Sequence, residues 1–172
     1  IFNDCFKLSL KSLLLNQNKK PLNEMEKINI ARQILDIINI IQNEKEINSD
    51  IRPETLIINT ENEVKLIDFG LMLHIPDFIN NEQIKNERIK YSPPEYLLDS
   101  TINNSYDIYS FGCILIDIFS TDLTNTILNK SYDQYEDYIK DVKENKYIKI
   151  PDNFNYLLQE IIKQSINTNP NQ

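Results

Sequence analysis

The stretch DIRPETLIINTENEVKLIDFG, residues 50–70, decides how this sequence is interpreted. It holds two short apolar runs, residues 56–58 and 64–67, separated by a polar turn. Two such runs on either side of a short turn predict a β-hairpin. Asp50 precedes the first run and Asp68 ends the second. The predicted hairpin should therefore direct both carboxylates into one cleft.

Further motifs follow in a fixed order. Asp68-Phe69-Gly70 closes the hairpin, Pro93-Pro94-Glu95 comes after an irregular segment, and residues 107–112, Asp-Ile-Tyr-Ser-Phe-Gly, open a strongly apolar stretch. With the run around Asp50, they resemble the C-terminal lobe of the eukaryotic protein kinases, whose pattern is H-R-D-x-x-x-x-N, then D-F-G, then A-P-E. One motif alone is a weak signal, and an unrelated domain would have to match all four by chance.

The resemblance covers nearly the whole chain and implies its fold class. It predicts a mainly α-helical domain with a small β-hairpin, the protein-kinase C-lobe. Residues 1–172 are expected to form one partial domain, from the hinge between the lobes to the penultimate helices. The sequence begins with Ile1 and has neither a G-x-G-x-x-G loop nor a V-A-I-K lysine. We therefore expect a fragment of a longer product, with the kinase N-lobe upstream.

Apolar periodicity locates the helices. Long helices are predicted over 25–43, 107–119, 132–142 and 154–166, with a short helix over 9–15 and one turn after Pro94. Asn23 is the expected N-cap of the first long helix, with Glu26 as its capping-box partner. The apolar stripe of that helix is expected to face the core. It comprises Ile28, Ala31, Ile34, Leu35, Ile38 and Ile41.

The resemblance also implies roles for individual residues. Asp50 matches the aspartate that orients the substrate hydroxyl and accepts its proton, and Asp68 matches the aspartate that holds Mg²⁺ on the ATP phosphates. Arg52 stands where Ser/Thr kinases carry a lysine that contacts the transferred phosphate. Thr55 stands where an asparagine holds a second magnesium, and Ile57 is expected in the nucleotide site. The implied cofactors are ATP and Mg²⁺, a hard cation that prefers oxygen ligands.

Departures from the kinase pattern leave two functions open. Asn48 and Ser49 replace the His-Arg pair, whose arginine normally grips a phosphate on the activation segment. Residues 71–90 contain no Ser, Thr or Tyr, so the switch and its receptor are absent together. Thr55 replaces the asparagine, and Arg88 replaces the threonine that braces the catalytic aspartate. An active Ser/Thr kinase and a pseudokinase acting as scaffold or allosteric partner both fit this pattern.

Composition bears on partners and location. The hydrophobic fraction of 41% and the charged fraction of 26% are ordinary for a globular protein. The net charge of −8 argues against a nucleic-acid or anionic-membrane surface. The resemblance to kinases implies a protein substrate or scaffold partner. Cys5 and Cys113 cannot form a disulfide framework, which favours a cytoplasmic location. His74, the only histidine, lacks Cys or His neighbours for a metal site.

The resemblance predicts three further features. Asp107 should be buried and should accept backbone N–H bonds from residues 48–49, because a buried carboxylate needs such partners. Glu95 should lack the arginine that pairs with it in kinases. Part of the surface that nucleotide and N-lobe cover in kinases should be exposed, around Leu56, Ile57 and Phe69.

Overall fold

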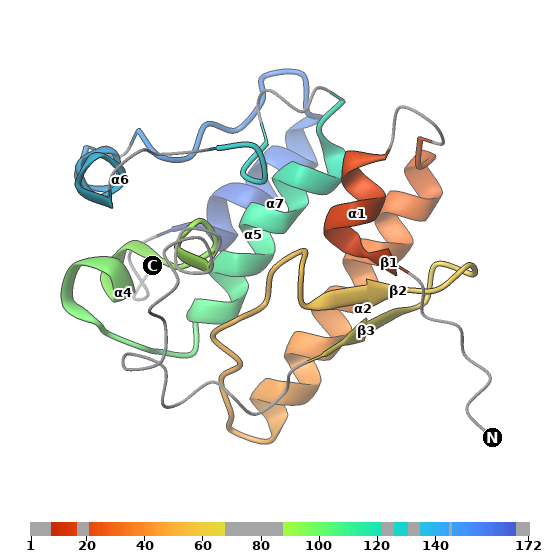
Figure 1. Ribbon diagram of the computed structural model, residues 1–172, viewed down its shortest axis with the longest axis horizontal. Coiled ribbons are helices and arrows are strands. Elements are labelled where there is room, and N and C mark those ends of the chain that lie inside the picture. Colours follow the sequence, from red (N-terminus) through yellow and green to blue (C-terminus); the bar gives the residue numbers. More distant parts are fainter. Residues whose placement is uncertain are drawn as a thin grey trace.

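The computed structural model describes residues 8–16, 21–67, 88–121, 126–130, 135–144 and 146–167 (Figure 1). Within these residues the chain is mainly helical with one small sheet. The strands are β1 Leu8–Ser9, β2 Leu56–Ile58 and β3 Val64–Leu66, and the helices are α1 Leu10–Leu15, α2 Glu24–Asn43, α4 Pro94–Asp99, α5 Tyr106–Phe119, α6 Tyr135–Lys143 and α7 Tyr156–Ser165. No helix in this part of the chain is both long enough and apolar enough to cross a membrane.

The sheet confirms the predicted hairpin. β2 and β3 pair antiparallel, with Leu56 opposite Leu66 and Ile58 opposite Val64. Residue 67 follows β3 and still donates its backbone N–H to the Thr55 carbonyl at 2.9 Å. β1 adds a third antiparallel strand beside β2. The sequence did not predict β1, because two residues are too few to show an alternating pattern.

Helix α2 begins with the predicted capping box. The Asn23 side chain accepts the Glu26 backbone N–H at 2.9 Å, and the Glu26 carboxylate accepts the Asn23 N–H at 2.9 Å. The buried face of the helix carries Ile30, Ala31, Ile34, Ile38 and Ile41.

The prediction that the whole apolar stripe of α2 faces the core is wrong at two positions. Ile28 is 48% exposed and Leu35 is 43% exposed, whereas Ile30 is fully buried. At 3.6 residues per turn, Ile28 and Leu35 lie roughly a quarter of a turn from the centre of the buried stripe. The apolar residues of α2 therefore cover a wider arc of the helix surface than the arc that packs against the core.

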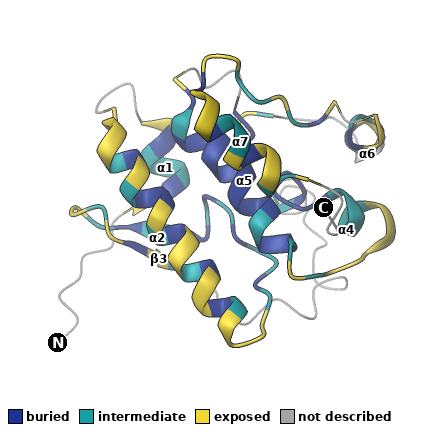
Figure 2. Cartoon of the chain, turned by 180° about the vertical axis from the view of Figure 1, so that it is seen from behind, coloured by how far each residue is buried: buried dark blue, intermediate teal, exposed yellow. Residues whose placement is uncertain are grey.

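Helix α5 forms the centre of the molecule, as its apolar sequence predicts. All but two of its 14 residues are buried, and Figure 2 shows it dark over most of its length. It contacts α2 and α7, and α4 and α6 lie on the far side of it from the sheet (Figure 1). At Gly112 an added Cβ would lie 2.7 Å from Ile166 Cγ2 and 2.8 Å from Ser165 Cβ, so α7 approaches α5 where α5 has no side chain.

The expected exposure around the hairpin is wrong for Leu56. Its side chain is 0% exposed, because strand alternation turns Leu56 and Ile58 toward the core. Ile57 points to the other face and is half-buried. Phe69 lies outside the described residues.

Among the later helices, α7 begins at Tyr156 rather than at residue 154, since the Asn155 side chain caps it by accepting the Leu158 N–H at 2.9 Å.

Candidate active site

The loop between α2 and β2 carries Asp50, and helix α5 fixes the conformation of this loop. Asp107 accepts the Asn48 backbone N–H at 2.7 Å and the Ser49 N–H at 2.8 Å. The Asp107 side chain is buried, as predicted, with the residue 1% exposed. Burial raises the pKa of Asp107, and the two backbone bonds oppose that shift. Ser49 has a positive φ of 57°, so the loop adopts an unfavourable backbone conformation where Asp107 holds it.

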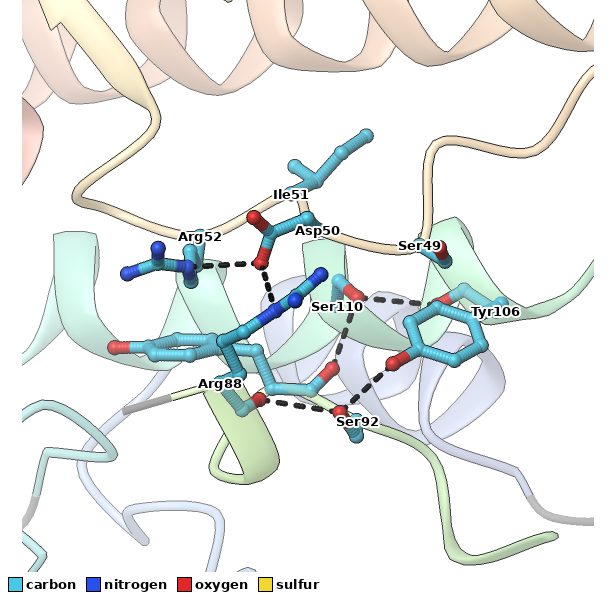
Figure 3. Close-up of a pocket in the computed structure, with 9 residues that line it drawn as sticks. Ser49, Asp50, Ile51, Arg52, Arg88, Ser92, Tyr106 and Ser110 are labelled. Atoms are coloured by element: carbon cyan, nitrogen blue, oxygen red, sulfur yellow. Dashed lines mark hydrogen bonds and ion pairs between the residues drawn. The ribbon is translucent and has the colours of Figure 1, made fainter. Parts of the chain in front are cut away.

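Two arginines converge on the Asp50 carboxylate, as Figure 3 shows. Arg52 Nε and Arg88 Nε both donate to Asp50 Oδ1 at 2.9 Å. All three side chains are largely buried, at 18% exposed for Asp50, 15% for Arg52 and 16% for Arg88. No described residue bonds to Asp50 Oδ2. One carboxylate oxygen is therefore held in place while the other remains available.

The charged cluster extends toward α1. Arg52 Nη1 lies 3.3 Å from Glu54 Oε2, and Lys11 Nζ lies 2.9 Å from Glu54 Oε1. The cluster thus joins three cations and two carboxylates.

Thr55 closes the same loop. The residue is 3% exposed, and its hydroxyl donates to the Asp50 carbonyl at 2.8 Å and lies 3.0 Å from the Arg52 carbonyl. The hydroxyl oxygen also accepts the Arg52 backbone N–H at 3.2 Å. These bonds hold the turn that brings Asp50 and Arg52 together.

The predicted metal ligands are not brought together in the described part of the chain. Asp68 lies outside it, and the Thr55 hydroxyl is bonded within its own loop. No cluster of three His, Cys, Asp or Glu side chains suited to a metal occurs among the described residues. These residues do not by themselves make a magnesium site, so the metal roles of Thr55 and Asp68 stay predictions. The nucleotide-binding role of Ile57 likewise stays a prediction.

Residues 88–92 form the wall of the site opposite Asp50, and α5 holds them. Tyr91 Oη donates to Asp117 Oδ2 at 2.6 Å, and Ser110 Oγ donates to the Tyr91 carbonyl at 2.9 Å. The Ser92 and Tyr106 hydroxyls lie 2.7 Å apart. This wall is therefore fixed to the core by buried polar contacts.

Helix α6 and the segment after it hold the same wall from the outside. Tyr138 Oη donates to the Ile89 carbonyl at 2.5 Å, and the Tyr147 hydroxyl donates to the Lys90 carbonyl. The two tyrosine rings meet edge to face, with centroids 4.7 Å apart. Sequence reasoning missed these contacts, although tyrosines in otherwise apolar surroundings usually find a polar partner.

Asp117 is an acid buried in α5. Desolvation raises the pKa of Asp117 to about 7, opposed by the hydrogen bond from Tyr91 and by backbone N–H bonds, including that of Leu128. The Leu128 N–H lies 3.0 Å from Asp117 Oδ1. Burial also raises the pKa of Tyr91. At neutral pH, Asp117 is thus close to its protonation midpoint inside the core.

Glu95, at the A-P-E position, presents one carboxylate oxygen to the interior. Its Oε2 is buried and has no hydrogen-bond partner among the described residues. The cost of such a group is appreciable when it is ionised.

Comparison with known proteins shows the family. A family model described as protein tyrosine and serine/threonine kinase matches residues 3–172. The chain belongs to this protein kinase family.

Individual relatives span several kinds of protein kinase. The dual specificity protein kinase zakA of Dictyostelium discoideum is 30% identical over 161 residues, which cover 94% of this chain and 20% of the relative. Vascular endothelial growth factor receptor 1 of Gallus gallus is 26% identical over 157 residues, 90% of the chain and 12% of the relative. Serine/threonine-protein kinase PLK4 of Drosophila virilis is 25% identical over 162 residues, 91% of the chain and 19% of the relative. The chain thus spans a fifth or less of the length of these three proteins.

Proposed function

We propose that this chain is the C-lobe of a cytoplasmic protein kinase that transfers the γ-phosphoryl group of ATP to Ser or Thr hydroxyls of other proteins. The observation that carries the proposal is the state of Asp50. Its loop is anchored to α5 through Asp107, one carboxylate oxygen is held by arginines, and Oδ2 has no partner among the described residues. A carboxylate held in this way can accept a hydrogen bond from a substrate hydroxyl.

The roles of the other residues follow from the same proposal. Arg52 lies beside Asp50 and keeps a positive charge near the transferred phosphate, where its planar fork suits phosphate oxygens. Asp68 would hold Mg²⁺, which neutralises charge on the phosphates when it is bound. Ile57 would contribute an apolar contact to the nucleotide. Phosphoryl transfer depends mainly on positioning and charge, so these few side chains carry most of the chemistry assigned to this lobe.

A pseudokinase remains the second candidate, and two contacts favour it. The Thr55 hydroxyl, at the position of a metal-binding asparagine, is used within the loop. Arg88, at the position of a threonine, forms an ion pair with Asp50. In this alternative the domain acts as a scaffold or allosteric partner of another protein and transfers no phosphate.

A phosphoryl-transfer assay separates the two candidates. The full-length protein is incubated with Mg²⁺, ATP labelled on its γ-phosphate and a generic protein substrate. An active kinase labels the substrate, and Asp68→Ala abolishes the labelling. If the wild type folds, as judged by circular dichroism, and transfers no label at any substrate concentration, the kinase proposal is wrong and the pseudokinase is supported.

A further inference from the structure

The arginines of this chain are few, and two of them meet at one atom. The sequence contains three arginines and 15 lysines. Arg52 and Arg88 both bind Asp50 Oδ1, although they stand far apart in the sequence. Lysine is the usual cation of this chain, so arginine at both positions indicates that the planar fork, with its several donors, matters there.

Each of these arginines keeps donors that Asp50 does not use. A guanidinium group has five N–H donors in a fixed plane. Arg88 uses Nε on Asp50, and its two terminal nitrogens have no hydrogen-bond partner among the described residues. Arg52 directs one terminal nitrogen to Glu54. The terminal nitrogens of Arg88 are therefore the principal unused donors beside Asp50.

The space beside these donors is locally positive. Arg52 and Arg88 line a shallow depression, partly open to solvent, together with Asp50, Ser49, Ser92 and Tyr106 (Figure 3). Lys11, Arg52 and Arg88 outnumber the carboxylates of Asp50 and Glu54 in the charged cluster. This local excess of positive charge contrasts with the net charge of −8 for the chain.

We propose that Arg88, supported by Arg52, forms an anion-binding site that selects acceptor peptides with a negatively charged group close to the phosphorylated hydroxyl. The inference rests on the proposed function, because it places the acceptor hydroxyl at Asp50 Oδ2. The Arg88 guanidinium contacts the same carboxylate at 2.9 Å. An extended peptide advances about 3.3–3.6 Å per residue, so the recognised group belongs to a residue one or two positions from the acceptor.

The chemistry of the site suits a carboxylate or a phosphate. The carboxylate is planar and the phosphate is tetrahedral, and each can accept two parallel hydrogen bonds from one guanidinium group. The source of the anion is therefore either an acidic side chain or a phosphorylated residue of the substrate. A neutral side chain of the same shape would leave the arginine donors without the charged partner.

The test compares peptides that differ in one charge. Four fluorescein-labelled peptides share a single Ser in an Ala-Gly background and carry Glu, phosphoserine, Gln or Lys at the positions next to it. Their binding to the full chain is measured by fluorescence anisotropy near physiological ionic strength, where the Debye length is about 8 Å. The net negative charge of the chain disfavours acidic peptides, so a preference for them must come from local cations.

We expect the Glu peptide to bind about tenfold more tightly than the Gln peptide, and the Lys peptide to bind most weakly. Tighter binding of phosphoserine than Glu would identify phosphate as the preferred anion, and the reverse order would identify the carboxylate. Arg88→Gln should remove the preference, and Arg88→Lys should retain part of it. Equal affinity of the Glu and Gln peptides for the wild type, including no detectable binding of either, would overturn the proposal.

A matched control is available in the third arginine. Arg32 is exposed on α2, where its Nη2 donates a hydrogen bond to Asn29 Oδ1 at 3.3 Å. Arg32→Gln removes the same charge and should leave the preference for Glu unchanged. Thermal melting of each variant shows whether it folds, and Arg88→Lys provides the test if Arg88→Gln does not. Loss of the preference in Arg32→Gln to the same extent as in Arg88→Gln would also overturn the proposal.

The outcome is distinguishable from failure of the proposed function. Peptide binding needs neither ATP nor phosphoryl transfer, so an acidic preference without transfer supports the anion site while rejecting the kinase activity. Phosphoryl transfer without a preference for acidic peptides would support the kinase activity and reject the anion-binding site.

Discussion

At the scale of single residues, Asp107 connects the core of the molecule to the loop that carries Asp50. The Asp107 carboxylate, on the buried helix α5, accepts hydrogen bonds from two consecutive backbone N–H groups of that loop. Asp107→Ala should lower the free energy of unfolding by roughly 1–3 kcal/mol, because the buried Asn48 N–H and the half-buried Ser49 N–H lose their acceptor. Urea unfolding followed by circular dichroism measures the change. Asp36→Ala, on the exposed face of α2, is the control and should change stability little; an Asp107 variant as stable as this control would contradict the assigned role.

Asp117 predicts how stability depends on pH. Burial raises the pKa of Asp117 to about 7, well above the value near 3.9 expected in the unfolded chain. The folded state therefore holds a proton that the unfolded state releases, so the contribution is present below about pH 4 and is lost as the pH rises toward 7. Relative to Asp117→Asn, the wild type should lose about 1.4 kcal/mol per pH unit across this window.

The measurement for Asp117 is the free energy of unfolding from pH 4 to pH 8. Other carboxylates titrate in both proteins, so only the difference between wild type and Asp117→Asn is compared. Asp152→Asn, at an exposed position, is the control and should parallel the wild type. A difference between wild type and Asp117→Asn that stays constant over the whole range would show that Asp117 titrates normally.

At the scale of elements, the packing of α7 against α5 depends on Gly112. On helix propensity alone, Gly112→Ala should stabilise α5 by about 1 kcal/mol. The added Cβ would lie 2.7 Å from Ile166 Cγ2 and 2.8 Å from Ser165 Cβ, and such overpacking costs roughly 1–3 kcal/mol. We expect the clash to dominate, so thermal melting should show a destabilised protein. Combining it with Ile166→Ala should cost less than the sum of the two single changes, whereas a stabilised Gly112→Ala would show that the helices pack less closely.

Elements with a local signal were predictable from the sequence. The capping box of α2, the hairpin and the apolar α5 each depend on residues close together in the chain, and periodicity or cap chemistry reveals them. The bond from Asp107 to the loop was predicted through the resemblance to kinases. It joins residues 59 positions apart, which no local pattern encodes.

The features that were missed depend on tertiary placement. The sequence marked Arg88 as a replaced threonine, yet it did not predict that the arginine itself would bind Asp50, 38 residues away. The hydroxyls of Tyr138 and Tyr147 reach carbonyls of the segment after residue 88 from 49 and 57 positions away. Leu56 was expected at the surface because in kinases this region meets the other lobe, but strand alternation turns it inward. The direction of a side chain in space decided each of these cases.

At the scale of the whole molecule, the 172-residue chain should transfer no phosphate by itself. It contains neither a G-x-G-x-x-G loop nor a V-A-I-K lysine, the elements that handle the ATP phosphates from the N-lobe. Purified chain, Mg²⁺-ATP and a generic protein substrate should therefore give no labelled product. Labelling that Asp68→Ala abolishes would contradict this expectation, since it would show a complete nucleotide site within the chain.

In the proposed kinase, Asp50 orients the acceptor hydroxyl of the substrate. The direct measurement is the rate of phosphoryl transfer by the full-length protein, with wild type compared with Asp50→Asn and with Asp36→Asn as control. Asp50→Asn keeps the shape of the side chain but removes its charge and basicity. We expect a rate roughly 10²–10⁴-fold lower, the range for a positioned general base, with the control unchanged. Transfer by Asp50→Asn at the wild-type rate would contradict this role of Asp50.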